Sequence, residues 1–390
     1  MILLAPDSFK GTLSSYEAGR ALALGLKRAG FPETDILALA DGGEGLAEAL
    51  LRARSGGKWA STPCRGPLGE KRRARFAWWP AQMRSIKKTS AHAALAALEM
   101  AASSGLPLVP EARRNPLITT TWGVGDQLRA ALDRGARTIL LGLGGSATND
   151  GGAGMAQALG ARLLDKSGRE LEPGGAALEK LTRVDVSHLD PRLKKCKIII
   201  ACDVVNRLCG KNGASHVFGP QKGASLSDVR RLDAALANYA RVLQRDLGCA
   251  VKNIPGAGAA GGLGAGCLAF LNAELKPGIE LVLDAANLDE RLKHARLAIT
   301  GEGFLDRQTS MGKAPSGVAR RAKKAGVPCI AIGGGIEASA RPRLKKLFAG
   351  LESLTEFAGS KQAALARPAF WLAKLAEARA HAWLAQAGKK

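Results

Sequence analysis

The sequence predicts an α/β protein made of two α/β domains. Short apolar runs alternate with amphipathic stretches at both ends of the chain, which is typical of parallel sheets covered by helices. Several of these runs end in turns rich in Gly, Asp and Ser. The length of 390 residues corresponds to two or three domains of ordinary size.

The first 54 residues predict a strand, a helix, a second strand and a second helix. The apolar run at 2–5 ends at Pro6 and predicts a buried strand. Ser14 and Glu17 form a capping-box pattern, so we expect a helix from there that ends near Gly30. Residues 35–40 and 46–54 then predict the second strand and the second helix.

Further strands and helices are expected along the rest of the chain, and they alternate again near its C-terminus. Strands are expected at 73–79, 138–143, 197–202, 297–300 and 328–332, and helices at 119–134, 227–247, 315–325 and 362–386. The Ala-rich residues 90–103 fit a helix or a strand equally. We therefore predict one flavodoxin- or Rossmann-like parallel sheet formed by residues 1–58 and 286–390, with residues 59–285 inserted as a second α/β domain.

Composition excludes several classes of protein. No uncharged apolar run reaches 18 residues, and the N-terminus lacks a basic start, so neither a membrane span nor a secretory signal is expected. The seven Cys include no C-x-x-C pair, which predicts reduced thiols in a cytoplasmic protein. The five His form no zinc-binding pattern.

The formal net charge of +23 has two interpretations. A basic patch can bind nucleic acid, whereas a basic solvated surface favours anionic substrates. The Lys and Arg residues are scattered in short groups with few interleaved aromatic residues. Because charge runs are usually solvated faces, the second interpretation is favoured.

Two polar turns follow the predicted strands near the N-terminus. Asp7, Ser8 and Lys10 place a carboxylate, a hydroxyl and an ammonium group within four residues. Asp41 and Glu44 flank a pair of glycines. Such carboxylates suit Mg²⁺ or general-base catalysis, and the ammonium group suits an anion. The alternative for the first turn is an ordinary capped turn with one surface ion pair, and the alternative for the second is a turn with Glu44 in the first turn of a helix.

A long Gly-rich segment follows the predicted strand at 138–143. Gly142, Gly144 and Ala147 fit the dinucleotide pattern G-x-G-x-x-[GA], and Asp165 lies 23 positions beyond Gly142. However, residues 149–152 interrupt the place where the helix should begin. A cradle for phosphate or a small hydroxy acid is therefore favoured. Its candidate ligand-binding residues are Gly144, Gly145, Ser146, Thr148, Asn149 and Asp150.

Further candidates lie at later strand ends and turns. Asp203 follows the strand at 197–202, Lys222 lies in a Gly-Pro-Gln-Lys-Gly turn, and Gly301 and Glu302 follow the strand at 297–300. Residues 255–264 predict a flexible loop able to lie against a nucleotide. The sequence contains no Walker loop, no G-x-S-x-G and no H-R-D motif. Backbone amides and lysines for polyanions, with acids for Mg²⁺ and a hydroxyl proton, indicate phosphoryl transfer.

In this order, the segments resemble the bacterial glycerate kinase family, of the glycerate 2-kinase type. The matching stretches are 5–10, 40–45, 99–102, 115–117, 144–154, 201–203, 218–223, 255–262 and 299–303. The resemblance covers nearly the whole chain. It implies ATP-dependent phosphorylation of D-glycerate to 2-phosphoglycerate, and two α/β domains with the site in the cleft between them. A homodimer is left open.

On this interpretation Asp203, Lys10 and Asp41 are the candidate catalytic residues, and Asp203 and Asp41 are the candidate Mg²⁺ ligands. Asp203 is the first choice for general base. Lys10 and Lys222 are expected to contact the transferred phosphoryl group or the substrate carboxylate. Glu44 serves metal or substrate, and residues 146–152 line the pocket.

The chain departs from the family pattern at a few positions. Phe304 stands where the family usually has Arg, and Arg307 is a candidate replacement. Residues 204–207 and 83–98 also differ from the family. Two rival functions remain, an NAD(P)-dependent dehydrogenase of a small hydroxy acid and a non-catalytic basic nucleic-acid-binding protein. An ADP-release assay across small hydroxy acids separates all three.

Overall fold

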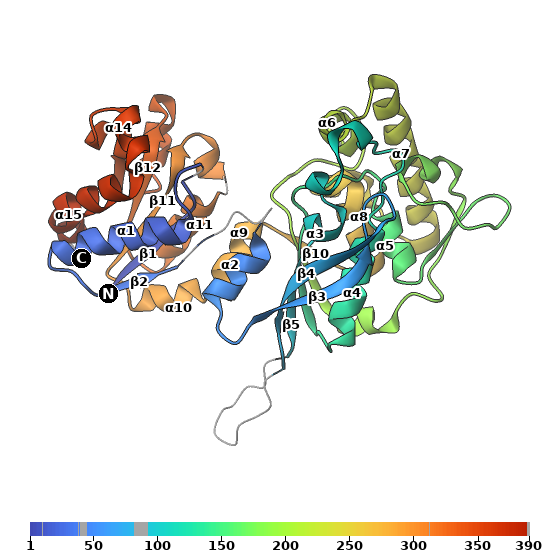
Figure 1. The fold of residues 1–390 in the computed structure, drawn as a ribbon, viewed down its shortest axis with the longest axis horizontal. Helices are drawn as coiled ribbons and strands as arrows, with labels where there is room; N and C mark the ends of the chain where they lie inside the picture. Colours follow the sequence, from blue (N-terminus) through green and yellow to red (C-terminus); the bar gives the residue numbers. More distant parts are fainter. Residues whose placement is uncertain (10, 38, 40–44, 82–92, 312, 388–390) are drawn as a thin grey trace, which may run out of the picture. The chain divides into compact units, whose positions relative to one another are not determined.

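The computed structural model describes residues 1–9, 11–37, 39, 45–81, 93–311 and 313–387. It forms two compact units. We call Met1–Asp41, Arg52–Arg54 and Ile279–Lys390 the terminal unit, and Gly42–Leu51 and Ser55–Gly278 the inserted unit. Both contain parallel strands flanked by helices, which confirms the predicted α/β class (Figure 1). The sequence predicted slightly different domains, residues 1–58 with 286–390 and residues 59–285. Those boundaries stay a prediction.

The terminal unit is built on a five-stranded parallel sheet that joins the two ends of the chain. Its order is β13-β12-β11-β1-β2. The strands are β1 (Ile2–Pro6), β2 (Thr34–Ile36), β11 (Leu297–Leu305), β12 (Cys329–Ile336) and β13 (Gly350–Ser353). Read along the chain, this is the flavodoxin order 2-1-3-4-5, whose topological switch point lies between β1 and β11.

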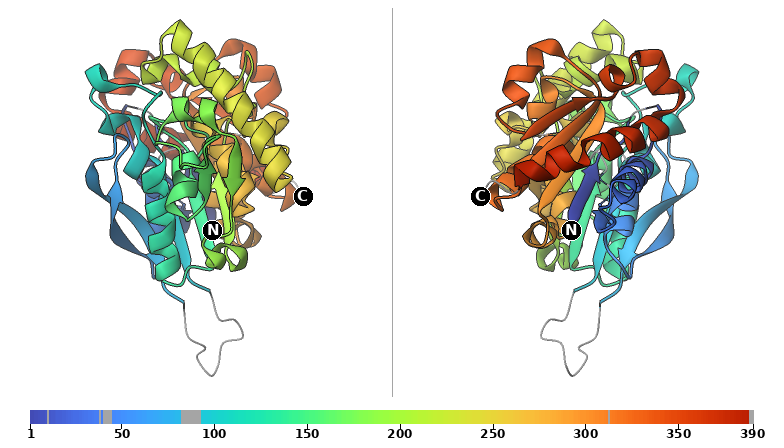
Figure 2. Two further views of the ribbon diagram at one scale, coloured as in Figure 1. Left: turned by 90° about the vertical axis from the view of Figure 1, so that its right-hand side faces the viewer. Right: turned by 90° about the vertical axis from the view of Figure 1, so that its left-hand side faces the viewer.

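Helices cover both faces of this sheet. On one face α1 (Ser15–Arg28) and α15 (Pro368–Ala387) lie side by side (Figure 2, right). Their apolar residues form one core with those of β1, β11 and β12. Ser14 and Glu17 form the predicted capping box at the start of α1. On the other face α11 (Ala314–Lys324) packs on β1, β11 and β12. The shorter helices are α10 (Leu288–Lys293), α12 (Arg341–Leu344), α13 (Leu354–Phe357) and α14 (Lys361–Ala366).

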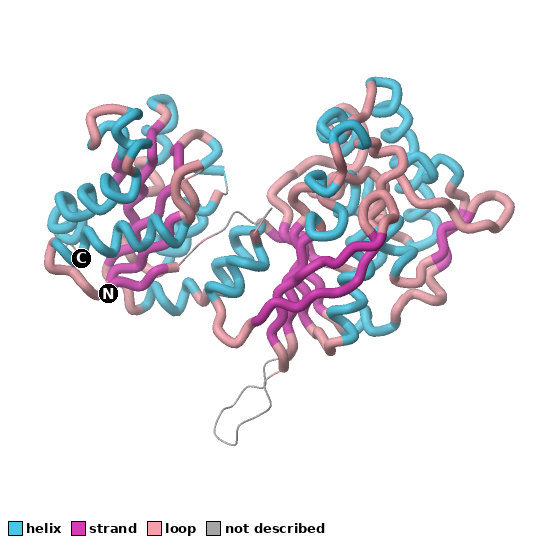
Figure 3. The backbone as a smooth tube through the Cα atoms, in the orientation of Figure 1, coloured by secondary structure: helices cyan, strands magenta, loops and turns pink. Residues whose placement is uncertain are grey.

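The inserted unit is built on a six-stranded sheet of order β10-β9-β6-β5-β4-β3. Figure 3 draws the strands in magenta. The first four strands are parallel, and β4 and β3 form an antiparallel hairpin at one edge. The strands are β3 (Lys58–Arg65), β4 (Lys71–Trp79), β5 (Leu95–Glu99), β6 (Thr138–Gly142), β9 (Lys197–Ala201) and β10 (Glu274–Lys276). A separate two-stranded sheet pairs β7 (Arg162–Leu164) with β8 (Arg183–Asp185).

The helices of the inserted unit pack around one large apolar core. They are α3 (Ala101–Ser104), α4 (Trp122–Asp133), α5 (Ala153–Ala158), α6 (Ala214–Phe218), α7 (Leu226–Leu247) and α8 (Ala259–Leu271). Two helices cross the boundary between the units, α2 (Leu46–Ala53) and α9 (Gly278–Ala285). Short 3-10 turns occur at Leu106–Leu108, Glu111–Arg113, Gly175–Lys180, Pro191–Lys195, Pro220–Lys222, Val251–Asn253, Gln308–Met311 and Ala338–Ala340.

Two sequence-based expectations are wrong. Residues 255–264 are not a flexible loop, because they lead into α8 and most of them from Gly256 on are buried in the core. The strand expected at 297–300 continues to Leu305, so Gly301 and Glu302 lie within β11 and not after it. Pairing with the Gly-rich end of β12 extends the strand, with Glu302 opposite Gly333 and Phe304 opposite Gly335.

Two further expectations are resolved or modified. The ambiguous stretch 90–103 contains both β5 and α3 within its described residues, 93–103. The helix expected at 362–386 is broken into α14 and α15 at Pro368, which cannot donate the backbone hydrogen bond that a continuous helix needs. Among the described residues, no helix has the length and apolar character needed to cross a membrane. All seven cysteines are free thiols.

Candidate active site

The Gly-rich segment between β6 and α5 forms part of a pocket in the inserted unit. β6 ends at Gly142, and α5 begins only at Ala153. Gly151 and Gly152, just before α5, have φ of +64° and +81°, which side chains rarely adopt. A dinucleotide-binding turn requires its helix to start directly after the glycines, so this connection is too long for one.

The first part of this segment presents unpaired backbone donors. Gly144, Gly145 and Ser146 line the pocket, and within the described part of the chain none of their N–H groups donates a hydrogen bond. The backbone is nevertheless held in place, because the Leu106 N–H donates to the Gly145 oxygen at 2.7 Å. Unpaired N–H groups on a fixed backbone suit a negatively charged ligand.

The pocket itself lies at the carboxyl ends of β6 and β9, where open α/β sheets bind their ligands. Its volume is about 510 Å³, a size suited to a small molecule. Its polar lining combines hydroxyl, carboxylate, amide and guanidinium groups, from Ser146, Asp203, Gln221 and Arg114. Its apolar lining includes Leu106, Leu143, Val204, Phe218 and Ala259.

Arg114 and Asp203 give this pocket one basic and one acidic group. Arg114 is half-buried, and its Nε is shielded from solvent without a hydrogen-bond partner among the described residues. Asp203 is exposed, and its Oδ1 accepts a hydrogen bond from the Gly278 N–H at 2.8 Å. A buried donor without a partner is unfavourable, so the Arg114 guanidinium is suited to an anionic ligand.

Lys222 lies beneath the Gly-rich segment and does not line the pocket. Its side chain is buried, with 1% exposed, and its Nζ donates to Ser146 Oγ at 2.8 Å and to the Thr148 carbonyl oxygen at 2.7 Å. Burial lowers the pKa of Lys222 to about 7, although the charge of Asp150 opposes the shift. A neutral amine has two N–H groups, and these two acceptors match them. Lys222 therefore holds the Gly-rich segment in place through Ser146 and Thr148, without lining the pocket itself.

Asp150 ties the Gly-rich segment to the start of α4. It is fully buried, and its Oδ2 accepts hydrogen bonds from the Thr121 N–H at 2.8 Å and the Thr121 hydroxyl at 2.9 Å. Burial raises the pKa of Asp150, against the hydrogen bonds from Thr121, Gly152 and Gly154. Asn149 is equally buried and donates to Ser215 Oγ at 2.9 Å. These residues hold the loop through contacts within the protein.

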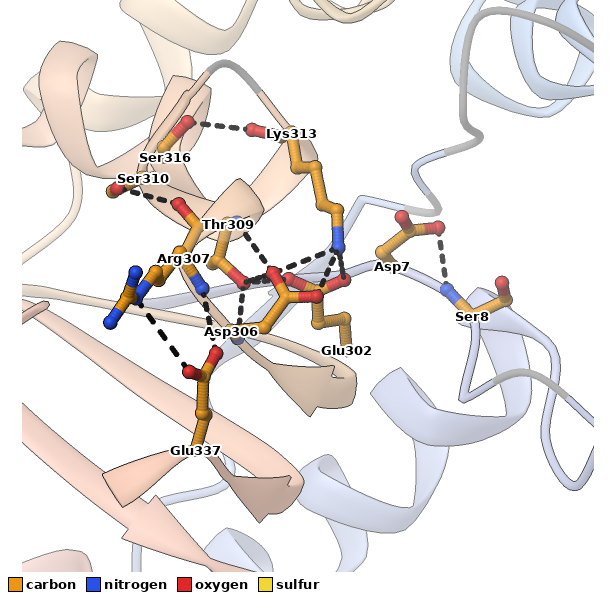
Figure 4. A network of polar contacts seen from close by, with 10 residues as sticks. All are labelled: Asp7, Ser8, Glu302, Asp306, Arg307, Thr309, Ser310, Lys313, Ser316 and Glu337. Carbon is orange, nitrogen blue, oxygen red and sulfur yellow. Dashed lines mark hydrogen bonds and ion pairs between the residues drawn. The ribbon is translucent and has the colours of Figure 1, made fainter. Parts of the chain in front are cut away.

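A second polar cluster lies in the terminal unit, at the carboxyl end of β11 (Figure 4). Lys313 points toward two carboxylates, and its Nζ lies 3.2 Å from Asp306 Oδ1 and 3.5 Å from Glu302 Oε2. Thr309 donates through Oγ1 to Glu302 Oε1 at 2.7 Å. Asp7 follows β1, the neighbouring strand, and its Oδ1 accepts a hydrogen bond from the Ser8 N–H at 2.6 Å. The cluster thus lies at the topological switch point, the preferred ligand site of such sheets.

The two carboxylates of this cluster differ in their environment. Burial raises the pKa of Glu302, although Thr309 and Lys313 oppose the shift. Burial also acts on Asp306, but hydrogen bonds from Thr309 and Lys313 outweigh it and lower the pKa of that carboxyl. The charges of Glu302 and Asp306 in turn raise the pKa of Lys313 against its partial burial.

Some predicted site residues are brought together and others are not described. Ser146 and Asp203 line one pocket with Gly144 and Gly145, and Asp7 lies with Ser8 in the other unit. Thr148, Asn149, Asp150 and Lys222 are buried around the pocket loop. Lys10, Asp41 and Glu44 lie outside the described residues. Arg307 is exposed and pairs with Glu337, 3.7 Å away.

Sequence reasoning missed Arg114, Thr309 and Lys313. Arg114 directly precedes the Asn-Pro-Leu stretch that carries the family resemblance, so its position beside that motif was the available signal. Thr309 lies on the 3-10 turn after β11, and Lys313 lies at the start of α11. Only the fold places both against Glu302. Their signal was a Lys and a Thr closely following an acidic strand end.

Metal-binding capacity rests on few oxygen donors. No group of three or more His, Cys, Asp or Glu side chains suited to a metal occurs in the part of the chain that the structure describes. Mg²⁺ in phosphoryl-transfer enzymes is usually held by one or two carboxylates together with substrate phosphates. The Asp203 carboxylate, which lines the pocket and is oriented by Gly278, fits that requirement.

Comparison with known proteins decides the family. The model of the glycerate kinase family matches residues 2–384. The chain belongs to the glycerate kinase family. A glycerate kinase of Halalkalibacterium halodurans is 48% identical over 337 residues, 86% of this chain and 85% of that protein. The glycerate 2-kinase of Escherichia coli K12 is also 48% identical, over 340 residues, 86% of this chain and 85% of that protein.

A solved structure supports the same assignment at the level of the fold. It is the crystal structure of a protein of Salmonella typhimurium LT2 provisionally named glycerate kinase 2, with a TM-score of 0.83 and 43% identity, covering 98% of each chain. The family resemblance predicted from the sequence motifs is therefore confirmed. Neither the dehydrogenase nor the nucleic-acid-binding alternative finds support in these glycerate kinase relatives.

Proposed function

We propose that this member of the glycerate kinase family transfers the γ-phosphoryl group of ATP to D-glycerate and yields 2-phosphoglycerate. One observation carries the proposal: the pocket of the inserted unit holds a guanidinium group, unpaired backbone N–H groups and a carboxylate together. A small hydroxy acid needs these groups, a cation for its carboxylate and a base for its hydroxyl. Transfer to the 2-hydroxyl is proposed because a relative with 48% identity is a glycerate 2-kinase.

In this proposal Arg114 binds the glycerate carboxylate, and Asp203 accepts the proton of the attacking hydroxyl. The N–H groups of Gly144, Gly145 and Ser146 bind negative charge on the substrate or on the transferred group. Lys222 acts as a positioning residue, because its amine holds Ser146 from behind. Positioning and charge neutralisation supply most of the rate in phosphoryl transfer, and the pocket provides both.

ATP and Mg²⁺ complete the proposed reaction. Asp203 can take one of two roles, general base or Mg²⁺ ligand beside the ATP phosphates, and Asp41 and Lys10 remain candidates for metal and phosphate binding. When bound, Mg²⁺ neutralises charge on the phosphates. In the terminal unit Lys313 and Thr309 lie at the switch point and are proposed to contact the nucleotide. We also propose a cytoplasmic protein, on the basis of its unpaired cysteines; a homodimer stays an open prediction.

Substitution of Arg114 and Asp203 tests the proposal. Arg114→Ala should raise KM for glycerate about 10- to 100-fold with little change in KM for ATP, since it removes a charge-assisted contact to the substrate carboxylate. Arg113→Ala, at the exposed neighbour, is the matched control and should leave both constants unchanged. Asp203→Asn should abolish turnover while the protein still unfolds at the wild-type temperature. Near-normal activity of both Arg114→Ala and Asp203→Asn would refute the proposed site.

The substrate and the alternatives are tested on the wild-type protein. ADP release is measured with D-glycerate, L-glycerate and other small hydroxy acids, and ³¹P NMR identifies the phosphorylated hydroxyl. D-glycerate should be the best acceptor and 2-phosphoglycerate the product. Appearance of 3-phosphoglycerate would correct the position of transfer. Nicotinamide-dependent oxidation, or duplex DNA binding without ADP release, would refute the kinase function.

A further inference from the structure

A second pocket lies within the terminal unit and is separate from the groups assigned above. Its volume is about 310 Å³, and it lies at the carboxyl ends of β11, β12 and β13. Its lining is mainly apolar, and its polar side chains are those of Thr12, Ser353, Thr355, Glu356 and Lys361. The lining includes Phe9, Phe304, Gly334, Gly335, Leu365 and Lys361.

Phe304 and Leu365 are two exposed apolar side chains of this unit. They are 52% and 53% exposed, and both line the pocket. Neither belongs to the apolar core beneath the sheet. Single exposed apolar residues need no explanation, but two that share one concave pocket indicate a surface that a ligand covers. Phe9 completes this wall from the core side and is 3% exposed.

Two glycines at the end of β12 line the pocket. A Cβ at Gly334 would lie 2.3 Å from the Gly303 oxygen, and a Cβ at Gly335 would lie 3.0 Å from two ring carbons of Phe304. The absence of a side chain at Gly335 therefore lets the Phe304 ring lie close to the β12 backbone. An aromatic ring in the wall of a pocket suits a planar ring system.

The pocket also lies where the topology favours a nucleotide. Phe9 and Thr12 come from the loop after β1, and Gly303 and Phe304 come from the end of β11, so the pocket uses both strands of the switch point. Phe304 is two residues beyond Glu302, the carboxylate that Thr309 and Lys313 contact. A base that contacts Phe304 would therefore lie beside the part of the chain that carries these polar groups.

Among the lining residues that the structure describes, Lys361 is the one cationic side chain. Thr355 donates through Oγ1 to the Gly334 oxygen at 2.6 Å, and Glu356 pairs with Arg341. Lys361 is exposed and, among the residues that the structure describes, has no ion-pair partner. A purine has ring nitrogens that accept hydrogen bonds at its edge, whereas an aliphatic ligand would leave this lysine unused.

We infer that this pocket binds the purine base of the nucleotide, with the Phe304 ring stacked on its face. The inference rests on the proposed kinase function, since that function supplies the nucleotide. It also gives a physical role to Phe304, which departs from the Arg of the family pattern: an apolar ring contributes stacking area where a guanidinium would contribute charge.

The test compares ATP with inorganic tripolyphosphate, which carries the phosphate charge but no base. Binding of each is measured by calorimetry to the full-length wild-type protein and to Phe304→Ala and Leu365→Asp. The matched controls are Phe370→Ala and Leu24→Asp, at exposed positions of the same unit outside the pocket. All variants are checked for the wild-type unfolding temperature.

Phe304→Ala and Leu365→Asp should each weaken ATP binding about tenfold, with unchanged tripolyphosphate binding and unchanged KM for glycerate. The two control variants should bind ATP as the wild type does. Unchanged ATP affinity in both pocket variants, or an equal loss of tripolyphosphate binding, would overturn the base site.

Failure of the inference and failure of the proposed function give different results. Wild-type turnover of glycerate with unchanged ATP affinity in the pocket variants rejects the base site alone. ATP binding that both variants weaken, without any phosphorylation of glycerate, supports the base site and rejects the proposed function. A wild-type protein that binds no ATP rejects both. A change in the oligomeric state of Leu365→Asp alone, with ATP affinity intact, would show that the pocket is a contact between copies of the chain.

Discussion

Lys222 is the most unusual single residue of the molecule. It is a lysine with 1% of its side chain exposed, and its pKa is lowered to about 7 by burial. An isolated buried ammonium group is strongly unfavourable, so the neutral amine is the form that burial favours. Its two hydrogen bonds, to Ser146 and Thr148, require only the protons that the neutral form keeps.

This burial predicts a specific pH dependence of stability. Between about pH 7 and 10.5 the unfolded chain binds a proton at Lys222 that the folded chain has released, so the free energy of unfolding should rise with pH in that range. One pKa unit corresponds to about 1.4 kcal/mol. Relative to Lys222→Met, the wild-type protein should gain about 3 kcal/mol from pH 7 to 9.5 in urea denaturation. Parallel pH profiles for the two proteins would contradict the assignment.

At the residue scale, the sequence predicted which side chains are candidates for the site better than it predicted where those side chains lie in the fold. The Gly-Pro-Gln-Lys-Gly turn identified Lys222 as a candidate, but its burial depends on packing against a loop 74 to 76 positions earlier. Ser146 and Asp203 were recognised because both follow strands, and such ends meet at one sheet edge. Arg114 was missed because Arg113 and Arg114 both lie next to the Asn-Pro-Leu motif, and only the fold shows that Arg114 lines the pocket.

At the scale of elements, α8 shows how a helix supports the site. Its first turn is kinked, with positive φ at Ala260, Gly261 and Gly262. The kink packs directly on the Gly-rich segment, where the Gly151 N–H donates to the Gly261 oxygen at 3.0 Å. The glycines of residues 255–264 therefore serve close packing between two backbones. Their sequence suggested a loop, because composition alone does not distinguish flexibility from close approach.

The kink predicts unequal effects for two glycine substitutions. A Cβ at Gly261 would lie 2.0 Å from the Thr148 oxygen, whereas a Cβ at Gly248, also at positive φ, meets nothing within 4 Å. Gly248→Ala should reduce the free energy of unfolding by about 1 kcal/mol through backbone strain alone. Gly261→Ala should reduce it by about 3 kcal/mol or more and also lower kcat, because the pocket loop must shift. Equal effects in chemical denaturation would contradict this packing.

Most elements followed from periodicity and caps, while their ends depended on partners. The capping box set the start of α1 correctly because it is a local interaction between Ser14 and Glu17. The extension of β11 to Leu305 could not be predicted, since it depends on pairing with β12. The pairing of β3 with β4 was missed for the same reason.

At the scale of the whole molecule, the main feature is the large positive net charge. The chain carries 57 Lys and Arg against 34 Asp and Glu, a formal net charge of +23. A positive field raises the local concentration of anionic substrates and is screened within about 10 Å at 0.1 M salt. The sheet formed from both chain ends was predicted from the alternation of elements, whereas a crevice shared by the two domains stays a prediction.

KM values should therefore depend on ionic strength. Raising NaCl from 20 to 300 mM should increase KM for both glycerate and ATP severalfold with little change in kcat, because screening weakens attraction before the chemical step. Steady-state kinetics in chloride and acetate salts at matched ionic strength separates screening from specific ion binding. KM values that stay constant across this range would show that the positive charge has no role in substrate capture.

The central position of β1 has a consequence for synthesis on the ribosome. β1 is entirely buried in the finished protein, yet its neighbour β11 begins at Leu297, which pairs with Ile2. At a synthesis rate of 5–20 residues per second, roughly 15 to 60 s pass between the synthesis of β1 and the synthesis of β11. During this time the apolar N-terminal strand has one open edge, while the segment that becomes the inserted unit can complete its own sheet. We therefore expect chaperones to bind newly made chains mainly at the apolar strand β1, until β11 is available to pair with it.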